Sequence, residues 1–320
     1  MKAIIYRKFG SPDVLELADV EKPVPGKNEI LLKVHAASAN AYDWRHLRAD
    51  PFLIHFMGAG IFKPSHPILG ADMAGTVEAV GSDVKSFKPG NRVFGEGGYG
   101  GFAEFACADA KRFAIMPDSI SFEEAAAAPM AALTSLQGLR DKGKIKAGDK
   151  VLVNGASGGV GSFAVQIARS FDAEVTGVCS TSKVDFVRSL GADFVLDYRK
   201  EDVTKSGEKY DLILDIAAYR PSGDYKRILK PGGMYVMIGG SMSRIFSMML
   251  KSSMGNRNMT VMIAEVKQAD LEVIAGMLGS GKIRSVIDKQ FPLEKTADAL
   301  RYLEQGKASG KVVVRVREKA

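Results

Sequence analysis

The sequence predicts an α/β fold, with a doubly wound parallel Rossmann sheet and a second, β-rich domain. From Lys150 onward, short apolar runs alternate with amphipathic segments at the spacing of βαβ units. Residues 1–118 instead consist of short β-type segments broken by turn sequences such as PVPGKN and KPGN. A chain of 320 residues is long enough for two such domains.

The β-rich part begins at the N-terminus and gives way to a helical stretch after Pro117. Its expected strands are KAIIYRKF, ILLKVHAAS, MAGTVEAV, RVFGEG and GFAEFACA. The stretch SFEEAAAAPMAALTSLQGLRDKG that follows has helical periodicity, and Ser121 and Glu124 have the spacing of a capping box. We therefore expect the second domain to open with a helix.

The parallel sheet is predicted by apolar runs without a polar face. The runs are VLV, VTGV, LILDI and YVMI, as expected for strands buried on both faces. From about residue 262 the pattern ends, and the segments QADLEVIAGMLGSG and LEKTADALRYLEQG are predicted as amphipathic helices before a terminal strand VVVRV. The methionine-rich segment 242–262 suits an adaptable apolar wall, either of a substrate pocket or of a subunit contact.

Composition and charge limit the classes of function. The chain is 46% hydrophobic and 25% charged, its N-terminus lacks a signal-peptide core, and no apolar run approaches the roughly 20 residues that span a bilayer. Cys107 and Cys179 lack a C-x-x-C spacing, which fits a reducing compartment, so we expect a cytoplasmic protein. The net charge is +7, but the basic residues are spread among 37 acidic ones, so we expect no nucleic-acid partner. An anionic small molecule fits this charge as well.

The glycine-rich stretch VLVNGASGGVGSFAVQIARSF, residues 151–171, predicts a dinucleotide site. An expected strand ends at Asn154, an expected helix starts near Gly161, and Ala156-x-Gly158-x-x-Gly161 lies between them. Gly158 leaves room for phosphate oxygens at backbone N–H groups, Gly161 allows close helix packing, and the helix N-terminus attracts the anion. The expected contacts also include Ser157, Gly159 and Val160. The alternative is a tight turn that binds nothing.

The residues after the second strand favour NADP over NAD. An acidic residue about 20 positions on would bind the ribose 2′-hydroxyl of NAD. Here Ser180, Thr181 and Ser182 precede Lys183, and the first acid is Asp185. Hydroxyl groups and an ammonium suit a 2′-phosphate, which a carboxylate would repel. The alternative for Lys183 is a solvated lysine at a helix start.

The chain also carries a series of motifs that together point to one family. In chain order they are GSPDVLEL, Asn40-x-x-Asp43, Pro67-x-x-Gly70-x-Asp72-x-x-Gly75, PGNRVFG, AALTSLQGL, NGASGGVGSFAVQIA, LGADFVLDY, YDLILDIA and FPLEKTADALRYLEQGKASGKVVV. In these motifs the chain resembles the zinc-free quinone oxidoreductase branch of the medium-chain dehydrogenase/reductase superfamily, including zeta-crystallin-like and alkenal reductase-like proteins. The resemblance implies a GroES-like domain from residues 1–118 and 262–320, a Rossmann domain from 119–261, and an active site in the cleft between them.

The resemblance also implies roles for single residues. Asn40 would reach the nicotinamide and substrate, where its amide could donate to a developing oxyanion. An Asx-type turn is the alternative role for Asn40, and Asp43 would orient its loop. On the cofactor side the implied contacts are Thr134 near the nicotinamide ribose, Tyr198 at the adenosine phosphate end, and Gly239 and Gly240 beside the nicotinamide. An edge strand near MTVMIAE is implied to pair two subunits, so we expect a homodimer.

No metal site is expected. Zinc-dependent members of the superfamily use a Cys in the N-terminal domain and a Gly-His-Glu stretch, which is Gly70-Ala71-Asp72 here, and no Cys lies near Asn40. The four histidines, His35, His46, His55 and His66, are nine to eleven residues apart, unlike metal ligands on one element. Without a metal Lewis acid, simple alcohol oxidation is disfavoured.

The sequence thus predicts an enzyme that transfers hydride from NADPH to quinones or α,β-unsaturated carbonyls. No catalytic acid can be named, although Tyr42 and Tyr99 are candidates, and Arg45 stands where the best-known relatives have Tyr. The alternative is a non-catalytic NADPH-binding protein on the same fold, with a sensing, structural or RNA-contacting role.

Overall fold

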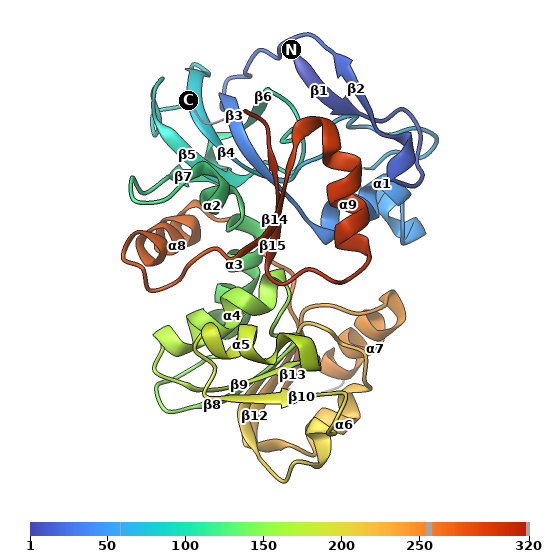
Figure 1. The fold of residues 1–320 in the computed structure, drawn as a ribbon, viewed down its shortest axis with the longest axis vertical. Coiled ribbons are helices and arrows are strands. Elements are labelled where there is room, and N and C mark those ends of the chain that lie inside the picture. Colours follow the sequence, from blue (N-terminus) through green and yellow to red (C-terminus); the bar gives the residue numbers. More distant parts are fainter. Residues whose placement is uncertain (58, 254–257, 318–320) are drawn as a thin grey trace. The chain divides into compact units, whose positions relative to one another are not determined.

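The computed structural model describes residues 1–57, 59–253 and 258–317. They form two compact units (Figure 1). The first unit comprises Met1–Met130, Val266–Ser280 and Ser285–Ala320, and the second comprises Ala131–Glu265 and Gly281–Arg284. The division expected from the sequence, at residues 118 and 262, stays a prediction. It differs at the first boundary because helix α2 (Phe122–Ala126) packs on strands of the first unit.

The first unit is built on a mixed sheet to which both ends of the chain contribute. Its strands are β3 (Glu29–Ala39), β4 (Asp72–Val80), β5 (Arg92–Glu96), β6 (Phe105–Asp109), β7 (Phe113–Ile115), β14 (Ile287–Pro292) and β15 (Lys311–Arg315). The order is β14-β15-β3-β4-β5-β7, with β6 also paired to β3; β14 and β15 run parallel, and the other pairs are antiparallel. A separate hairpin joins β1 (Lys2–Ile5) to β2 (Glu16–Asp19).

Strand β3 lies in the middle of this sheet and is buried along most of its length, which explains its long apolar run. The helices of this unit are α1 (Ala41–Arg48), α2, α8 (Gln268–Gly279) and α9 (Thr296–Glu304). Short 3₁₀ segments occur at Pro12–Val14, Phe52–Met57, Ala110–Arg112 and Leu293–Lys295. The expected capping box of α2 is confirmed, because Ser121 N donates to Glu124 and Glu124 N donates to Ser121 Oγ.

The second unit contains a six-stranded sheet in which every pairing is parallel. Its strands are β8 (Lys150–Asn154), β9 (Glu174–Cys179), β10 (Phe194–Asp197), β11 (Tyr210–Asp215), β12 (Leu229–Met237) and β13 (Met259–Val261). The order β10-β9-β8-β11-β12-β13 is that of a doubly wound Rossmann sheet, which confirms the predicted fold class. The order reverses at β8, where ligands of such sheets bind.

Helices cover this sheet along its length. They are α4 (Gly159–Ser170), α5 (Val184–Ser189), α6 (Ser222–Lys226) and α7 (Met242–Ser253). Helices α4 and α5 pack on β8, β9 and β10, whereas α6 and α7 pack on β12 and β13 (Figure 1). Helix α3 (Pro129–Gln137) starts at the last residues of the first unit and continues into the second, where a π-helical turn (Gly138–Lys142) follows it. Further 3₁₀ turns occur at Thr181–Lys183 and Val203–Lys205.

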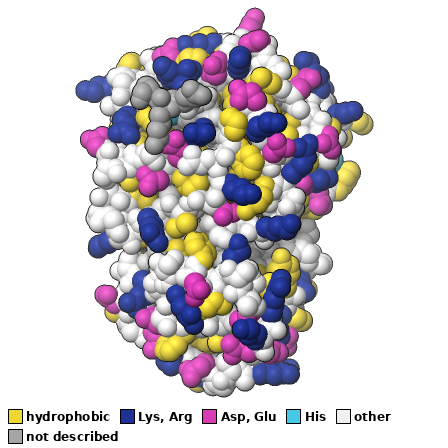
Figure 2. All heavy atoms as spheres, viewed as in Figure 1, with side chains coloured by type: hydrophobic (Ala, Val, Ile, Leu, Met, Phe, Trp, Pro, Cys, Tyr) yellow, Lys and Arg dark blue, Asp and Glu magenta, His cyan; other side chains and the backbone are white. Residues whose placement is uncertain are grey.

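The surface carries charges of both signs. On the face shown in Figure 2, lysine and arginine side chains are interspersed with acidic ones instead of forming one large basic patch. No helix among the described residues is long and apolar enough to cross a membrane.

Candidate active site

The glycine-rich turn lies between β8 and α4, at the edge where the strand order reverses. Strand β8 ends at Asn154, and α4 begins at Gly159 with Gly158 as its N-cap residue. Gly158 has no side chain to cap the helix, so the first-turn amides of Gly159, Val160 and Gly161 have no acceptor within it. The turn therefore offers a row of N–H groups and the positive end of a 12-residue helix to an anion.

Gly161 and Gly158 differ in whether the fold itself requires glycine at their positions. A Cβ at Gly161 would lie 2.1 Å from the Gly155 carbonyl oxygen, so Gly161 is required for the backbone to close on itself. A Cβ at Gly158 would have its nearest neighbour at 3.6 Å, which is an ordinary contact. The protein itself thus tolerates a side chain at position 158. Ala156 is fully buried and donates its N–H to Val178 O at 3.0 Å.

A buried polar network below this turn was not predicted. Asn154 Nδ2 donates to Asp215 Oδ1 at 2.7 Å and to Tyr225 Oη at 2.8 Å, and Tyr235 Oη donates to Asp215 Oδ2 at 2.6 Å. Burial raises the pKa of Asp215, while these hydrogen bonds oppose the shift. The network fixes the residue that precedes the turn. The sequence signal was an acid that closes an apolar strand, LILD.

The residues expected at the adenosine end follow two neighbouring strand ends. Cys179 of β9 and Asp197 of β10 are partners in the sheet, and Tyr198 N donates to Cys179 O at 3.1 Å. Lys183 N donates to Ser180 O at 2.9 Å, which closes the turn after β9. The Tyr198 side chain is 53% exposed. The structure thus brings Ser180, Lys183 and Tyr198 to one edge of the sheet.

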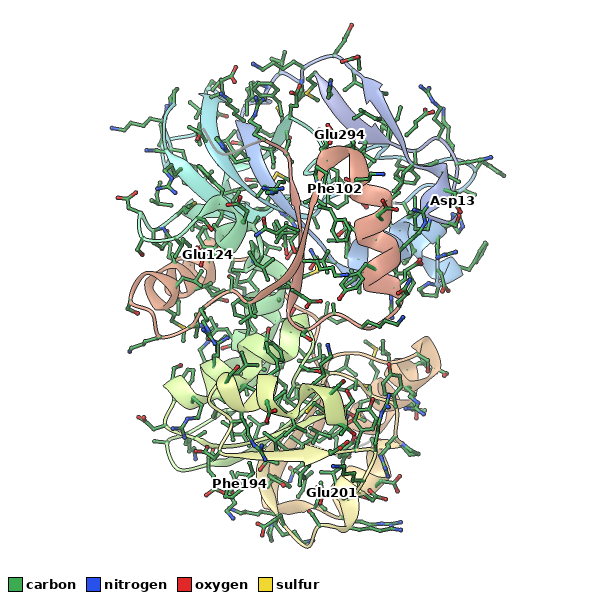
Figure 3. All side chains as sticks on the ribbon, in the orientation of Figure 1. Asp13, Phe102, Glu124, Phe194, Glu201 and Glu294 are labelled. Atoms are coloured by element: carbon green, nitrogen blue, oxygen red, sulfur yellow. The ribbon has the colours of Figure 1, made fainter. Side chains whose placement is uncertain are left out.

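This edge also holds an acid that the sequence reasoning missed. Asp197 is 6% exposed, its Oδ1 accepts from Arg199 N at 3.0 Å, and its Oδ2 has no hydrogen-bond partner among the described residues. Figure 3 labels Phe194 at the start of β10 and Glu201 shortly beyond its end, which marks the direction in which the parallel strands run. Asp197 caps the turn that follows β10.

The other expected cofactor residues lie just after the end of β12 and on α3. A Cβ at Gly239 would lie 2.2 Å from Ile216 O, and Gly240 has a φ of +120°, so both positions need glycine for the backbone itself. The backbone therefore explains both glycines by itself, and the expected approach of a nicotinamide to them stays a prediction. Thr134 is buried on α3 in the second unit, with 8% of its surface exposed.

Asn40 lies at the end of β3 and its side-chain amide is fully engaged within the first unit. Its Nδ2 donates to Ser38 O at 3.2 Å and to Asp72 Oδ2 at 3.0 Å, while its Oδ1 accepts from Lys311 Nζ. Both amide hydrogens are used, so none is left for a substrate oxygen. The geometry favours a positioning role, and the catalytic role of Asn40 stays a prediction.

Asp43 holds two loops together. Its Oδ2 accepts from Asn40 N at 2.8 Å, and its Oδ1 accepts from Gly70 N at 3.0 Å and Ala71 N at 3.2 Å. Burial raises the pKa of Asp43 to about 7, although the amide donors oppose the shift. All of these partners are backbone donors, so the geometry agrees with the expected role of orienting the loop.

The buried charged groups near Asn40 are the carboxyl groups of Asp43, Asp72 and Glu96 and the ammonium of Lys311. Asp72 and Lys311 are 0% and 4% exposed, and Lys311 Nζ lies 3.6 Å from Asp72 Oδ2. Burial raises the pKa of Asp72 and lowers that of Lys311, while their mutual attraction opposes both shifts. Glu96, the cross-strand partner of Asp72, has a pKa raised to about 8 by burial first and by the charge of Asp72 second. Neither Lys311 nor Glu96 was predicted.

Tyrosine and histidine rings form a cluster beside α1. The Tyr42 and Tyr99 rings are 5.8 Å apart, the His46 ring lies 3.8 Å from that of Tyr42, and the His66 ring stacks on Tyr99 at 4.0 Å. Burial raises the pKa of Tyr42, and the neighbouring Tyr99 adds to the shift. The guanidinium of Arg45 lies 5.4 Å from the Trp44 ring. The two candidate acids of the sequence are therefore neighbours.

Two family models match the chain. The model described as "Alcohol dehydrogenase GroES-like domain" matches residues 26–118, and the model described as "Zinc-binding dehydrogenase" matches residues 190–314. The chain is 35% identical to the chloroplast envelope quinone oxidoreductase homolog of Arabidopsis thaliana, over 98% of each protein. It is 33% identical to the chloroplastic NADPH-dependent alkenal/one oxidoreductase of the same plant, covering 98% of this chain and 79% of that protein.

Solved structures agree with the fold. The Escherichia coli quinone oxidoreductase, crystallised in complex with NADPH, superposes with a TM-score of 0.83 at 26% identity, over 99% of this chain and 100% of that one. This likeness spans both units of the chain.

A zinc ion does not fit the residues at positions 70–72. Ala71 offers no ligand atom, and both oxygens of Asp72 accept hydrogen bonds, from Met130 N and Asn40 Nδ2. The buried ammonium of Lys311 beside Asp72 would repel a divalent cation. Across residues 1–57, 59–253 and 258–317, no group of three or more His, Cys, Asp or Glu side chains could hold a metal ion.

Proposed function

Because this chain belongs to the quinone oxidoreductase branch of the medium-chain dehydrogenase/reductase superfamily, we propose that it is an NADPH-dependent oxidoreductase of quinones or α,β-unsaturated carbonyls. The observation that carries the proposal is the N-terminus of α4, which has no side-chain cap because its N-cap residue is Gly158. When bound there, NADPH supplies a hydride. A quinone or a conjugated carbonyl accepts it without a Lewis acid, which suits a chain whose residues do not fit zinc.

The cofactor would be held along the carboxyl edge of the parallel sheet. The amides of the turn between β8 and α4 would bind the diphosphate, and Ser180, Lys183 and Tyr198 would surround the adenosine phosphate end. The absence of an acid at residues 179–184 supports NADPH over NADH. Lys183→Asp, measured with both cofactors, tests this preference. The preference for NADPH is expected to fall at least tenfold, and an unchanged preference would remove Lys183 from the site.

The reduction also needs a proton, and we assign its delivery to Tyr99. Hydride transfer forms a C–H bond and leaves an electron pair on the conjugated oxygen, which must gain a proton. The Tyr42 and Tyr99 rings are 5.8 Å apart, so Tyr42 is close enough to take part in replacing a proton that Tyr99 loses. Tyr99→Phe is expected to lower kcat at least tenfold while the Kd for NADPH stays unchanged. Unchanged turnover would sink the assignment.

Steady consumption of NADPH with 1,4-benzoquinone or acrolein tests the enzymatic proposal. The competing function is a binding protein that uses the same nucleotide pocket for sensing, structure or RNA contact. That function predicts tight NADPH binding without turnover across a broad panel of electrophiles. The family membership and the activities for which the relatives are named favour the enzyme.

We also propose a homodimer in the cytoplasm. Strand β13 is the edge of the parallel sheet and can accept a second copy of itself. Beside it, Phe246 and Ile263 are 70% and 69% exposed, which fits the subunit-contact interpretation of the methionine-rich segment. Residues 254–257 of that segment lie outside the described residues. Light scattering after size-exclusion chromatography tests the dimer, and fractionation of the source cells tests the location.

A further inference from the structure

In the first turn of helix α3, a backbone N–H group donates to a carboxylate that lies far away in the sequence. The first residue of the helix, Pro129, has no N–H group, and Ala128 before it has no side chain that could cap. The next amide, Met130 N, donates to Asp72 Oδ1 at 3.0 Å. Asp72 thus does for α3 what an N-cap side chain does elsewhere, from a position 58 residues earlier in the chain.

Asp72 is itself held by two buried side chains. Its Oδ2 accepts from Asn40 Nδ2 at 3.0 Å and lies 3.6 Å from Lys311 Nζ, and Lys311 also donates to Asn40 Oδ1. The three side chains come from β4, the end of β3 and β15, which are adjacent in the sheet. The hydrogen-bond acceptor of α3 is therefore anchored to the centre of the first-unit sheet.

One turn further along α3 lies Thr134. Residues four apart on a helix lie on the same side, so Thr134 lies one turn from Met130 on the same side of α3. We propose that Asp72, held by Lys311 and Asn40, is a positioning residue that sets Thr134 at the nicotinamide end of NADPH. The inference depends on the proposed function, since it names the cofactor that Thr134 contacts.

Asp72→Asn is the informative change. The groups that hydrogen-bond or ion-pair with the carboxylate are all donors, namely Met130 N, Asn40 Nδ2 and Lys311 Nζ. An asparagine of the same shape would place its own NH2 group against one of these donors and would lose the charge that attracts the helix N-terminus. Asp109→Asn is the matched control, because Asp109 is an exposed residue of the same unit that caps a short 3₁₀ turn through Lys111 N.

The experiment compares two ligands by calorimetry on the full chain. NADPH occupies both halves of the dinucleotide site, whereas 2′,5′-ADP occupies only the adenosine half. Asp72→Asn and Lys311→Met are each expected to raise the Kd for NADPH about tenfold and to leave the Kd for 2′,5′-ADP unchanged. Lys311→Arg keeps the positive charge and is expected to retain most of the wild-type affinity for NADPH. Asp109→Asn is expected to change neither Kd.

A double-mutant cycle separates positioning from general damage. Thr134→Ala should raise the Kd for NADPH about as much as Asp72→Asn does. The double variant should bind NADPH no more weakly than either single variant. Additive losses, or equal losses for NADPH and 2′,5′-ADP, would overturn the inference. If Asp72→Asn does not fold, Asn40→Ala replaces it in the cycle, because it removes one of the donors that hold Asp72.

The outcome also distinguishes this inference from the proposed function. A wild-type protein that binds neither ligand would refute both. If the wild type binds NADPH but the losses of affinity in Asp72→Asn and Thr134→Ala are additive, only the positioning role would be refuted.

Discussion

Lys311 Nζ lies 3.6 Å from Asp72 Oδ2 at a place where both side chains are almost wholly removed from solvent. Lys311 opens the last strand of the chain, and Asp72 opens β4. Breaking a buried pair leaves the other charge uncompensated, which costs far more than the loss of an exposed ion pair. The cluster therefore links the C-terminal strand to the residues that orient the loop before α1.

Replacing Lys311 with Met is expected to lower the free energy of unfolding by about 3–5 kcal/mol, because Asp72 would stay buried without its cation. Urea unfolding at pH 7 measures the loss. Lys8→Met removes an exposed lysine of the same unit and should change stability by less than about 0.5 kcal/mol. Equal stability of the two variants would show that the buried ion pair contributes little.

Two glycine variants separate the needs of the fold from those of the ligand. Gly161→Ala would place a methyl group 2.1 Å from Gly155 O and is expected to cost about 2–3 kcal/mol in unfolding free energy. Gly158→Ala meets only an ordinary contact at 3.6 Å, so its stability should stay within about 0.5 kcal/mol of wild type.

Ligand binding, unlike stability, should be sensitive to the Gly158→Ala change. The added methyl group would occupy the space that the diphosphate needs, so the Kd for NADPH is expected to rise at least tenfold in a fully folded protein. Calorimetry and thermal unfolding of the same preparation give both quantities. Wild-type affinity in Gly158→Ala would place the nucleotide elsewhere.

Most of the fold could be predicted because its signals are local. Strands buried on both faces give continuous apolar runs, and the glycine-rich turn between Asn154 and Gly159 has few alternatives. Helix α7 was not predicted, since its methionines suit many environments. Strand β12 starts earlier than expected, at Leu229, because Leu229 pairs with Tyr210 before a register shift.

The interior of the candidate site could not be predicted in the same way. Lys311, Asp72 and Asn40 are far apart in the sequence, and the register of β15 on β3 and of β3 on β4 brings them together. A lysine before VVV looks like a solvated strand residue, whereas the structure buries it. The role expected for Asn40 depended on a free amide, and only the hydrogen bonds of its neighbours show that the amide is engaged.

The raised pKa of Glu96 predicts a pH dependence of stability. This group has a pKa of about 8 in the folded protein against 4.5 ordinarily, mainly because of burial and the charge of Asp72, while Arg112 and Lys311 oppose the shift. The folded state therefore holds a proton that the unfolded state has lost between about pH 4.5 and pH 8. Its contribution to stability is present below pH 4.5 and disappears as the pH rises through 8, with a slope of at most about 1.4 kcal/mol per pH unit.

Glu96→Gln removes this titration and keeps the shape of the side chain. Relative to the variant, the wild type is expected to lose unfolding free energy steadily from pH 5 to pH 8, as measured by urea unfolding at each pH. Glu201→Gln, at an exposed position, controls for the loss of one negative charge. A constant difference between wild type and Glu96→Gln across this range would contradict the prediction.

The network below the glycine-rich turn should be stabilising. Tyr235→Phe removes the 2.6 Å hydrogen bond to the buried carboxylate of Asp215 and is expected to cost about 1.5–3 kcal/mol. Tyr219→Phe, at a position that is 83% exposed, is the control. Chemical unfolding of both variants tests this, and equal stabilities would mean that Asp215 finds another donor.

Calorimetric titration of the purified wild-type chain with NADPH, with NADH as comparison, tests the central claim most directly. We expect one NADPH per chain, with an affinity at least tenfold higher than that for NADH. If neither reduced nucleotide binds, the turn between Asn154 and Gly159 is not a dinucleotide site, and the proposed reductase activity is contradicted.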